Sequence, residues 1–416
     1  MSVKEKNLLQ RLVQIPSVNP DFEVSKNFGP GEAALTDFLQ DFVTRQGWPW
    51  LRQCVHPGRD NLVAVCRPPN LDNSRPDNSQ DVILWEAHQD TVGVVGMKIN
   101  PFSASESQGR IWGRGACDNK GGMAAMLTAL VRAQVEPSSQ RSIVVLALTI
   151  NEENGFTGAK ALARLWDADD LDAETELHLS GPLSIAELRQ LVPTKVIVAE
   201  PTELDVVVAH KGCLRWCCQT HGQAAHSSQP ERGVNAIYTM AKVVRALEAF
   251  QADVLDHRAA HPSCGRPTVC VSTIRGGAGI NTVPDQAAIE IDRRLLPGEH
   301  PAHAYEELVR YVAAALPERT DQIKHLQPST QCSGLTDHAN RDWGKQIAAT
   351  VHALGLESKL VGVPFGTDAW VFAERGLPTV VFGPGSIDQA HTDDEWIAVD
   401  QLSQATEAFY RLACGL

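Results

Sequence analysis

The chain has 416 residues, of which 43% are hydrophobic and 21% are charged, and its formal net charge at pH 7 is −13. This composition is typical of a folded globular protein and excludes a disordered or fibrous chain. The acidic excess argues against a nucleic-acid partner, and no apolar stretch has the length of a membrane span. Ten cysteines without regular spacing, in a chain that opens without a signal-peptide pattern, favour reduced thiols and a cytoplasmic location.

Taken in chain order, the first half alternates between helical and strand patterns. Helices are predicted at 1–15, 32–46, 121–135 and 159–166, and strands at 61–66, 81–85, 141–150, 195–199 and, later, 379–382. The polar stretch 68–80 is predicted to be a solvated loop. Strands that alternate with helices indicate an α/β fold with a mostly parallel sheet covered on both faces.

The middle of the chain has a different order. Strands are predicted at 206–220, 268–275, 287–294 and 323–327, with helices at 233–250 and 301–316. This βαββαβ order is the split βαβ pattern of a small ferredoxin-like α+β domain. We therefore predict a large α/β domain, residues 1–206 and 328–416, interrupted by a smaller domain, residues 207–327.

Acidic and histidine side chains follow four of the predicted strands. Taken alone, each has an ordinary interpretation, such as a surface histidine, a solvated loop or a helix N-cap. Ligands bind beyond the carboxyl ends of the strands in open α/β sheets, and mixed His and Asp/Glu ligands suit zinc and related divalent ions. The coincidence therefore predicts a metal site built from these residues: Glu86, His88, Asp90, Glu152, Glu153, Glu200 and His391, joined by Asp118 from a glycine-rich turn.

Spacing indicates specific roles for some of these residues. Asp90 lies two residues after His88, so its carboxylate can accept a hydrogen bond from the far ring nitrogen and fix the tautomer of that histidine. The two oxygens of Asp118 could bridge two ions roughly 3.5–4 Å apart. Glu152 and Glu153 are neighbours in irregular backbone, so one can bind metal while the other accepts a proton.

Five stretches occur in order along the chain: LWEAHQDTV, GRGACDNKGG, INEENG, VAEPTE and FGPGSIDQAHTDDE. Together they resemble the co-catalytic zinc amidohydrolases and metallopeptidases that include acetylornithine deacetylase, succinyl-diaminopimelate desuccinylase, aminoacylase and the glutamate carboxypeptidases. The resemblance covers nearly the whole chain. It implies a zinc-peptidase-like catalytic domain with an inserted lid or dimerisation domain.

The resemblance also implies roles for individual residues. His88 and Glu200 would bind one metal ion, and Glu153 and His391 would bind the other. Asp118 would bridge the two ions, and the peptide bond between Asp118 and Asn119 would be cis. Glu152 would be the general base, and Asp90 would be the carboxylate that supports the metal ligand His88. In the predicted lid, AAHSSQPERGVNAI, GGAGINTVP and EIDRRLLPGE carry the family's substrate-contacting residues. These are His226, which would reach the partner subunit's active site, Asn281 and Arg294; the backbone at Gly385 would help to hold a substrate carboxylate.

The implied activity is hydrolysis of the amide bond of an N-acyl amino acid by a homodimer that joins through its lids. Two divalent ions per subunit, zinc with cobalt as a substitute, would polarise the attacking water and the scissile carbonyl. A dipeptidase or carboxypeptidase with the same metal centre is the nearest rival function. The residues are also compatible with a non-catalytic metal- or small-ligand-binding protein, and with a thiol enzyme that uses Cys117 or Cys213.

Overall fold

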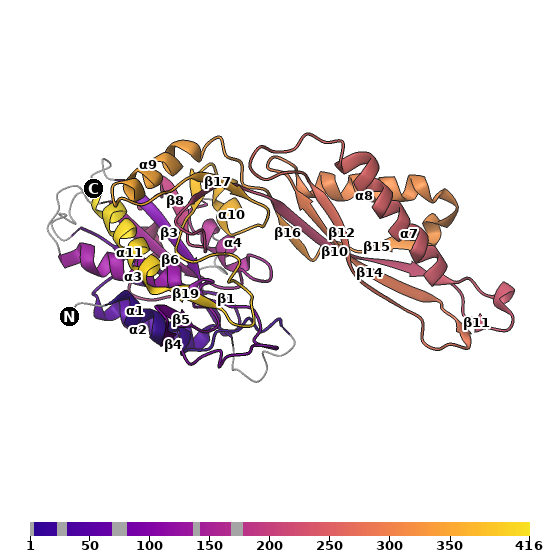
Figure 1. The fold of residues 1–416 in the computed structure, drawn as a ribbon, viewed down its shortest axis with the longest axis horizontal. Helices are drawn as coiled ribbons and strands as arrows, with labels where there is room; N and C mark the ends of the chain where they lie inside the picture. The colour runs from indigo at the N-terminus through magenta and orange to yellow at the C-terminus, as the bar shows by residue number, and fades with distance from the viewer. Residues whose placement is uncertain (1–3, 23–30, 69–80, 136–141, 168–177) are drawn as a thin grey trace. The chain divides into compact units, whose positions relative to one another are not determined.

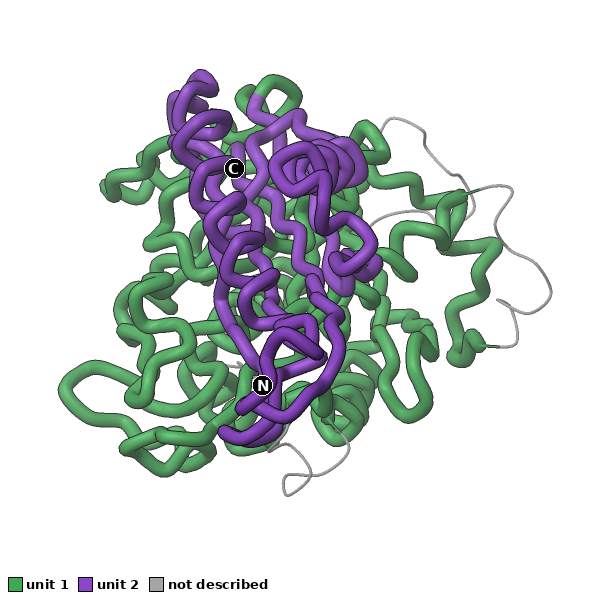
Figure 2. Tube along the Cα trace, turned by 90° about the vertical axis from the view of Figure 1, so that its right-hand side faces the viewer, with its two compact units in different colours: residues 1–208, 338–361, 367–416 green, residues 209–337, 362–366 purple. Residues whose placement is uncertain are grey.

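The computed structural model describes residues 4–22, 31–68, 81–135, 142–167 and 178–416. The chain divides into two compact units, shown in Figure 2: unit 1 comprises residues 1–208, 338–361 and 367–416, and unit 2 comprises residues 209–337 and 362–366. Residues 69–80 of the predicted loop lie outside the described residues. Among the helices of the described segments, none combines the length and hydropathy that a membrane span requires.

Unit 1 is built on a nine-stranded mixed sheet. In spatial order its strands are β17 (Leu360–Val363), β9 (Val206–His210), β18 (Thr379–Val381), β8 (Lys195–Val198), β3 (Val82–His88), β6 (Ile143–Thr149), β2 (Arg59–Cys66), β1 (Trp50–His56) and β7 (Leu179–Ser180). The predicted α/β class is confirmed, and the four central strands from β18 to β6 pair in parallel. Strand β2 pairs antiparallel with β6, and β1 pairs antiparallel with β2 through a tight hairpin, which needs no crossover helix.

Helices pack on the central strands and bury their side chains. The predicted helices are present as α1 (Glu5–Val13), α2 (Ala33–Arg45), α3 (Lys120–Val135) and α4 (Thr157–Arg164). Four helices were not predicted: α6 (Ile185–Arg189), α9 (Arg341–His352), α10 (Ala369–Ala373) and α11 (Val399–Cys414). A small sheet was also not predicted, and it consists of β4 (Ser105–Ser107), β5 (Arg110–Trp112) and β19 (Trp396–Ala398).

Strand β3 has different surroundings on its two faces. Ile83, Trp85 and Ala87 belong to the hydrophobic core that also contains residues of α3 and α11, and the rings of Trp85 and Phe409 are 5.1 Å apart. Because side chains alternate along a strand, Glu86 and His88 point to the opposite face. The register of β3 therefore directs its polar side chains away from this core.

The predicted strand 206–220 is wrong as a single element. It is two strands, β9 and β10 (Gly212–His221), which belong to different sheets, and the boundary between the units falls within β9. At Gly212 a Cβ atom would lie only 2.3 Å from the carbonyl oxygen of Cys332, so glycine permits the close approach of the returning chain. The alternating pattern continues across the break between the two strands, so the sequence pattern gives no sign of the break.

Unit 2 has the predicted βαββαβ order: β10, α7 (Ala236–Phe250), β12 (Thr268–Gly276), β14 (Gln286–Leu295), α8 (Pro301–Ala315) and β15 (Ile323–His325). The sheet order is β12-β14-β10-β15 with antiparallel neighbours, which is ferredoxin-like. Trp216, Phe250 and Ile289 contribute to a core between this sheet and its helices. A further strand, β16 (Thr330–Cys332), pairs with the start of β10, and β11 (Ala225–His226) pairs with β13 (Thr282–Val283) (Figure 1).

Candidate metal centre

Six of the predicted side chains converge in unit 1. They form two groups whose candidate ligand atoms lie within 4.8 Å of one another: His88 with Glu152 and Glu200, and Asp118 with Glu153 and His391. Four of the six follow β6, β8 and β18, as predicted, whereas His88 is the last residue of β3 rather than following it. Strand β3 extends that far because His88 still pairs with Thr149 of β6.

Asp118 lies between the two groups. Its Oδ1 is 3.0 Å from Nε2 of His88, and its Oδ2 is 3.2 Å from Nε2 of His391. The remaining carboxylates approach the same two nitrogens, because Glu200 Oε1 is 3.7 Å from His88 Nε2 and Glu153 Oε1 is 3.2 Å from His391 Nε2. One carboxylate oxygen thus faces each group, which is the arrangement required to share one ligand between two ions.

The charge of this cluster is concentrated and buried. Burial raises the pKa of Glu152 well above its ordinary value, and the neighbouring carboxylate of Glu200 raises it further. Burial and the carboxylate of Asp118 act in the same direction on the pKa of Glu200. Burial disfavours protonation of His391, but hydrogen bonds with Asp118 and Glu153 outweigh it and raise the pKa of His391 to about 11. Such a cluster retains protons until a cation neutralises it, so cation binding should release protons.

His88 is oriented by the backbone more than by the predicted carboxylate. Its Nδ1 donates to the carbonyl oxygen of Asp90 at 2.9 Å, whereas Oδ1 of Asp90 is 3.6 Å away. With the proton on Nδ1, the lone pair of Nε2 faces Asp118 and Glu200 and is available to a metal ion. The predicted tautomer therefore follows from the structure, but the nearer partner is a carbonyl group.

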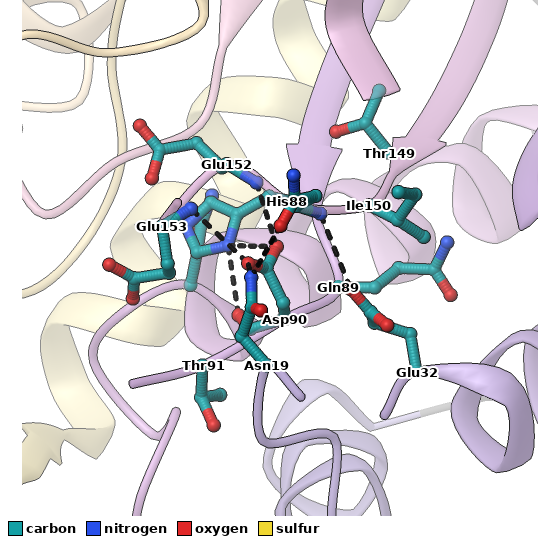
Figure 3. Close-up of polar contacts among 12 residues, drawn as sticks. Asn19, Glu32, His88, Gln89, Asp90, Thr91, Thr149, Ile150, Glu152 and Glu153 are labelled. Atoms are coloured by element: carbon teal, nitrogen blue, oxygen red, sulfur yellow. Dashed lines mark hydrogen bonds and ion pairs between the residues drawn. The ribbon is translucent and has the colours of Figure 1, made fainter. Parts of the chain in front are cut away.

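The carboxylate of Asp90 instead holds the turn that carries the two glutamates. It accepts hydrogen bonds from the backbone N–H of Glu152 at 3.1 Å and of Glu153 at 3.2 Å, and from Nδ2 of Asn19 at 2.7 Å. Figure 3 shows the side chains of Glu152 and Glu153 leaving this turn in different directions. Adjacent residues therefore enter different ligand groups. Asn19 was not predicted, since nothing near it in the sequence marks it.

A second carboxylate, Glu395, holds the loop that carries Asp118. It is fully buried and accepts backbone hydrogen bonds from Gly115 at 3.0 Å, Cys117 at 2.8 Å and Asp118 at 3.0 Å. It also forms an ion pair of 2.7 Å with the buried Arg114. This role of Glu395 was not predicted, because an acidic residue in an acidic run gives no sign of burial.

Two further carboxyl groups are buried beside the site. Glu86 accepts a hydrogen bond from the hydroxyl of Thr149, and burial raises its pKa to about 7. Asp368 has no exposed surface, and within the described part of the chain its two oxygens have no hydrogen-bond partner. Its charge raises the pKa of Glu152, after larger contributions from burial and other groups. Glu86 and Asp368 therefore add two carboxyl groups to those of the candidate metal ligands.

Several other predictions meet mixed outcomes. The Asp118–Asn119 peptide is cis. Cys117 is buried, and burial raises the pKa of its thiol well above the ordinary value, which argues against a thiolate nucleophile there. The N–H of Gly385 donates to Oε1 of Gln401 at 2.6 Å. The predicted contact of the Gly385 backbone with a substrate carboxylate stays a prediction.

The remaining predicted residues lie in unit 2. His226 and Asn281 are exposed and close in the fold, since His226 pairs with Thr282, the neighbour of Asn281. Nδ1 of His226 accepts from the hydroxyl and backbone N–H of Ser228 at 2.7 and 3.2 Å. Arg294 lies near the other end of β14, where its Nε and Nη2 donate to Asp292 at 2.8 and 3.2 Å.

Comparisons with known proteins agree with this geometry. A family model described as "Peptidase family M20/M25/M40" matches residues 84–414. An acetylornithine deacetylase of Yersinia pseudotuberculosis is 31% identical over 344 residues, which are 79% of this chain and 78% of that protein. A probable carboxypeptidase of Emericella nidulans is 28% identical over 415 residues, which are 98% of this chain and 88% of that protein.

Solved structures show the same fold. An M20 family metallo-carboxypeptidase from Sulfolobus solfataricus has a TM-score of 0.73 at 19% identity, covering 100% of both chains. A tripeptidase from Staphylococcus aureus also has a TM-score of 0.73, at 21% identity, covering 100% of this chain and 99% of that one. At these identities the likeness concerns the fold.

Proposed function

The chain belongs to peptidase family M20/M25/M40 and is a metal-dependent hydrolase, and we propose that it cleaves the amide bond of an N-acyl amino acid at the six-residue centre of unit 1. The observation that carries the proposal is the position of Asp118, whose two oxygens face His88 at 3.0 Å and His391 at 3.2 Å. A single shared carboxylate between two ligand groups is suited to two divalent ions that act on one water molecule.

The residues of the chain divide the work of hydrolysis. Two divalent ions, when bound, supply Lewis-acid polarisation of the water and the scissile carbonyl. Glu152, whose pKa is raised by burial and by Glu200, accepts the water proton and passes it to the leaving amine. Asp90 fixes the backbone of Glu152 and Glu153, so that the base and the adjacent ligand keep their separate directions.

Zinc is the ion we propose, with cobalt as a substitute. Two imidazoles and several carboxylates are the donor set of catalytic zinc sites, and cobalt accepts the same mixed ligands. The site residues suit a cation, because the described ligand groups bring together more carboxylates than cationic side chains. Metal analysis of the loaded protein should give two equivalents per chain.

The two histidines test the assignment of the ligand groups. His88→Ala and His391→Ala should each lose one ion, because each removes the imidazole of one group. Ion content measured by mass spectrometry of the desalted protein would decide the matter. Two tightly bound ions in both variants would contradict the centre proposed here.

The substrate class rests on the relatives. The acetylornithine deacetylase, at 31% identity, supports an N-acyl amino acid, whereas the probable carboxypeptidase, which matches 98% of this chain, supports a peptide substrate as the second candidate. A panel of N-acyl amino acids and dipeptides, assayed with zinc- and cobalt-loaded protein, would separate the two. Faster turnover of dipeptides than of every acyl amino acid would favour the peptidase.

We also propose a homodimer that shares its active sites through unit 2. Between Ala287 and Arg294, β14 is continuous strand, which at about 3.3 Å per residue spans roughly 23 Å. His226 pairs with Thr282, before the start of that strand. This placement of His226 and Arg294 toward opposite ends of the strand supports a site to which two subunits contribute.

We also propose that His226 donates a hydrogen bond to the oxyanion of the substrate, and its tautomer supports this role. Because Nδ1 accepts two hydrogen bonds from Ser228, the neutral ring carries its proton on Nε2, where it can be donated to substrate. Mixing the inactive variants Glu152→Ala and His226→Ala under subunit exchange should restore activity, since one site of the mixed dimer is then intact. No recovery in a proven mixed dimer would contradict the shared site.

The cellular setting remains a prediction from composition. All ten cysteines are thiols in the structure, which supports the proposed reducing, cytoplasmic location. The net charge of −13 supports small-molecule rather than nucleic-acid partners. Fractionation of the native host with compartment markers would test the location.

A further inference from the structure

Two cysteines that are distant in the sequence face each other in unit 2. Cys213 lies near the start of β10, Cys332 is the last residue of β16, and the two are directly opposite in antiparallel register. Both are reduced and buried. The main segment of unit 2 runs from Ala209 to Asp337, so the pair joins the strand that enters the unit to the strand that leaves it.

The backbone ladder determines the spacing of this pair. His210 and Leu335 exchange two hydrogen bonds of 3.2 and 3.0 Å, which makes them a hydrogen-bonded pair. The next ladder pairs Cys213 with Cys332, Leu214 with Gln331 and Arg215 with Thr330. The Cα atoms of directly opposed antiparallel residues are about 4.5–5.5 Å apart, within the range of about 4.4–6.8 Å that disulfides span.

The surroundings favour sulfur chemistry at Cys213. Its hydrogen bond with Cys332 lowers the pKa of the Cys213 thiol to about 7, against the opposing effect of burial, and the charges of Arg215 and Arg294 help. Cys218, on the same strand, differs, because burial raises the pKa of its thiol to about 12. The thiolate is the nucleophilic form of cysteine, so Cys213 is the reactive member of this strand.

The packing around Cys332 leaves room for its sulfur. A Cβ atom at Gly366 would lie only 2.8 Å from Sγ of Cys332, so a larger residue there would displace it. Directly opposed residues of an antiparallel pair point their side chains to the same face of the sheet. The two thiols are therefore on the same face of the sheet, where a hydrogen bond joins them.

We propose that Cys213 and Cys332 form a reversible disulfide when the protein meets hydrogen peroxide. The Cys213 thiolate attacks one peroxide oxygen and displaces hydroxide, which is protonated to water, leaving a sulfenic acid on Cys213. The sulfur of Cys332 then attacks the sulfenic sulfur, and the departing hydroxyl group leaves as a second water with the proton of Cys332. Two thiols and one peroxide thus give one disulfide and two waters, and a dithiol reductant returns both thiols.

The bond would fasten the two ends of the main segment of unit 2. It closes the loop from Cys213 to Cys332, and a cross-link over so long a loop restricts the unfolded chain. Oxidised protein should therefore unfold at a higher temperature than reduced protein. This inference is independent of the metal centre and of the proposed activity.

The test is to treat the fully reduced, full-length protein with peroxide under native conditions. Protease digestion and mass spectrometry without reduction should reveal a peptide linking Cys213 to Cys332, with the mass of two hydrogen atoms lost, and a dithiol should reverse it. The rate should rise with pH around neutrality. Recovery of other pairings only, or of sulfinic acid at Cys213 without the link, would overturn the proposal.

Two variants test the pair, and a third is the matched control. Cys213→Ala and Cys332→Ala should each lose the link and the oxidation-dependent rise in unfolding temperature. Cys218→Ala, on the same strand and equally buried, should keep both. Because the peptide map of the unaltered protein is decisive by itself, a folding defect in one variant leaves the proposal testable. An unchanged rise in unfolding temperature in folded Cys332→Ala would contradict it.

Discussion

Glu395 is expected to control both stability and the affinity of the metal centre, although it contacts no substrate. Its oxygens accept from three backbone N–H groups of the loop before α3 and pair with Arg114 at 2.7 Å. In Glu395→Gln, an NH2 group replaces one carboxylate oxygen and faces an N–H donor that it cannot accept from. Arg114 also loses its buried counter-charge. Breaking one partner of a buried pair costs about 3–5 kcal/mol, so the free energy of unfolding should fall by about that amount.

The same substitution should loosen Asp118, because Glu395 accepts the backbone N–H of that residue at 3.0 Å. Loss of a group that orients a ligand commonly lowers metal affinity by about 10- to 100-fold. Chemical denaturation of the metal-free variant and chelator competition for each ion would measure the two effects. Asp394→Asn is the matched control, since it makes the same charge change at an exposed neighbour and should change stability by less than about 0.5 kcal/mol. Glu395→Gln with unchanged stability and affinity would refute the reasoning.

Three further predictions concern the base, the substrate carboxylate and pH. Glu152→Gln should retain both ions but lose about 100- to 10,000-fold in kcat, because the amide cannot accept a proton; normal turnover in the metal-replete variant would exclude Glu152 as the base. Arg294→Ala should lower kcat/KM about tenfold for a free-carboxylate substrate and little for its carboxamide, and equal losses would point to a folding defect. Burial lowers the pKa of His325 from 6.5 to about 4. Between these pH values the unfolded chain binds more protons than the folded chain, so the free energy of unfolding should fall by at most about 3 kcal/mol as the pH drops. In His325→Gln, the free energy of unfolding measured at both pH values should depend less on pH.

Much of the metal centre was accessible from the sequence. His88, Glu152, Glu200 and His391 were predicted because each lies at or just beyond the end of a short β-branched run, and such ends meet at one edge of an α/β sheet. The inserted unit was equally visible, since its βαββαβ order is a local property of consecutive periodic segments.

Other features depend on contacts between distant segments. The alternation of residues 206–220 is compatible with one strand, and only the close approach of Cys332 to Gly212 reveals two strands in separate sheets. The N–H of Gly385 donates to Gln401 of α11, which follows it by 16 residues. Neither partner can be inferred from local spacing, because each is set by the packing of the whole unit.

Local hydrophobic periodicity encodes the positions of the strand ends, and it therefore predicts which side chains meet. How these side chains are held depends on contacts between distant segments. Asp90 lies two residues from His88, but its carboxylate accepts from the turn at Glu152, and Glu395 supports Asp118 from a segment far along the chain. Buried carboxylates find whichever N–H groups packing leaves without partners, and that choice depends on the complete three-dimensional arrangement of the unit.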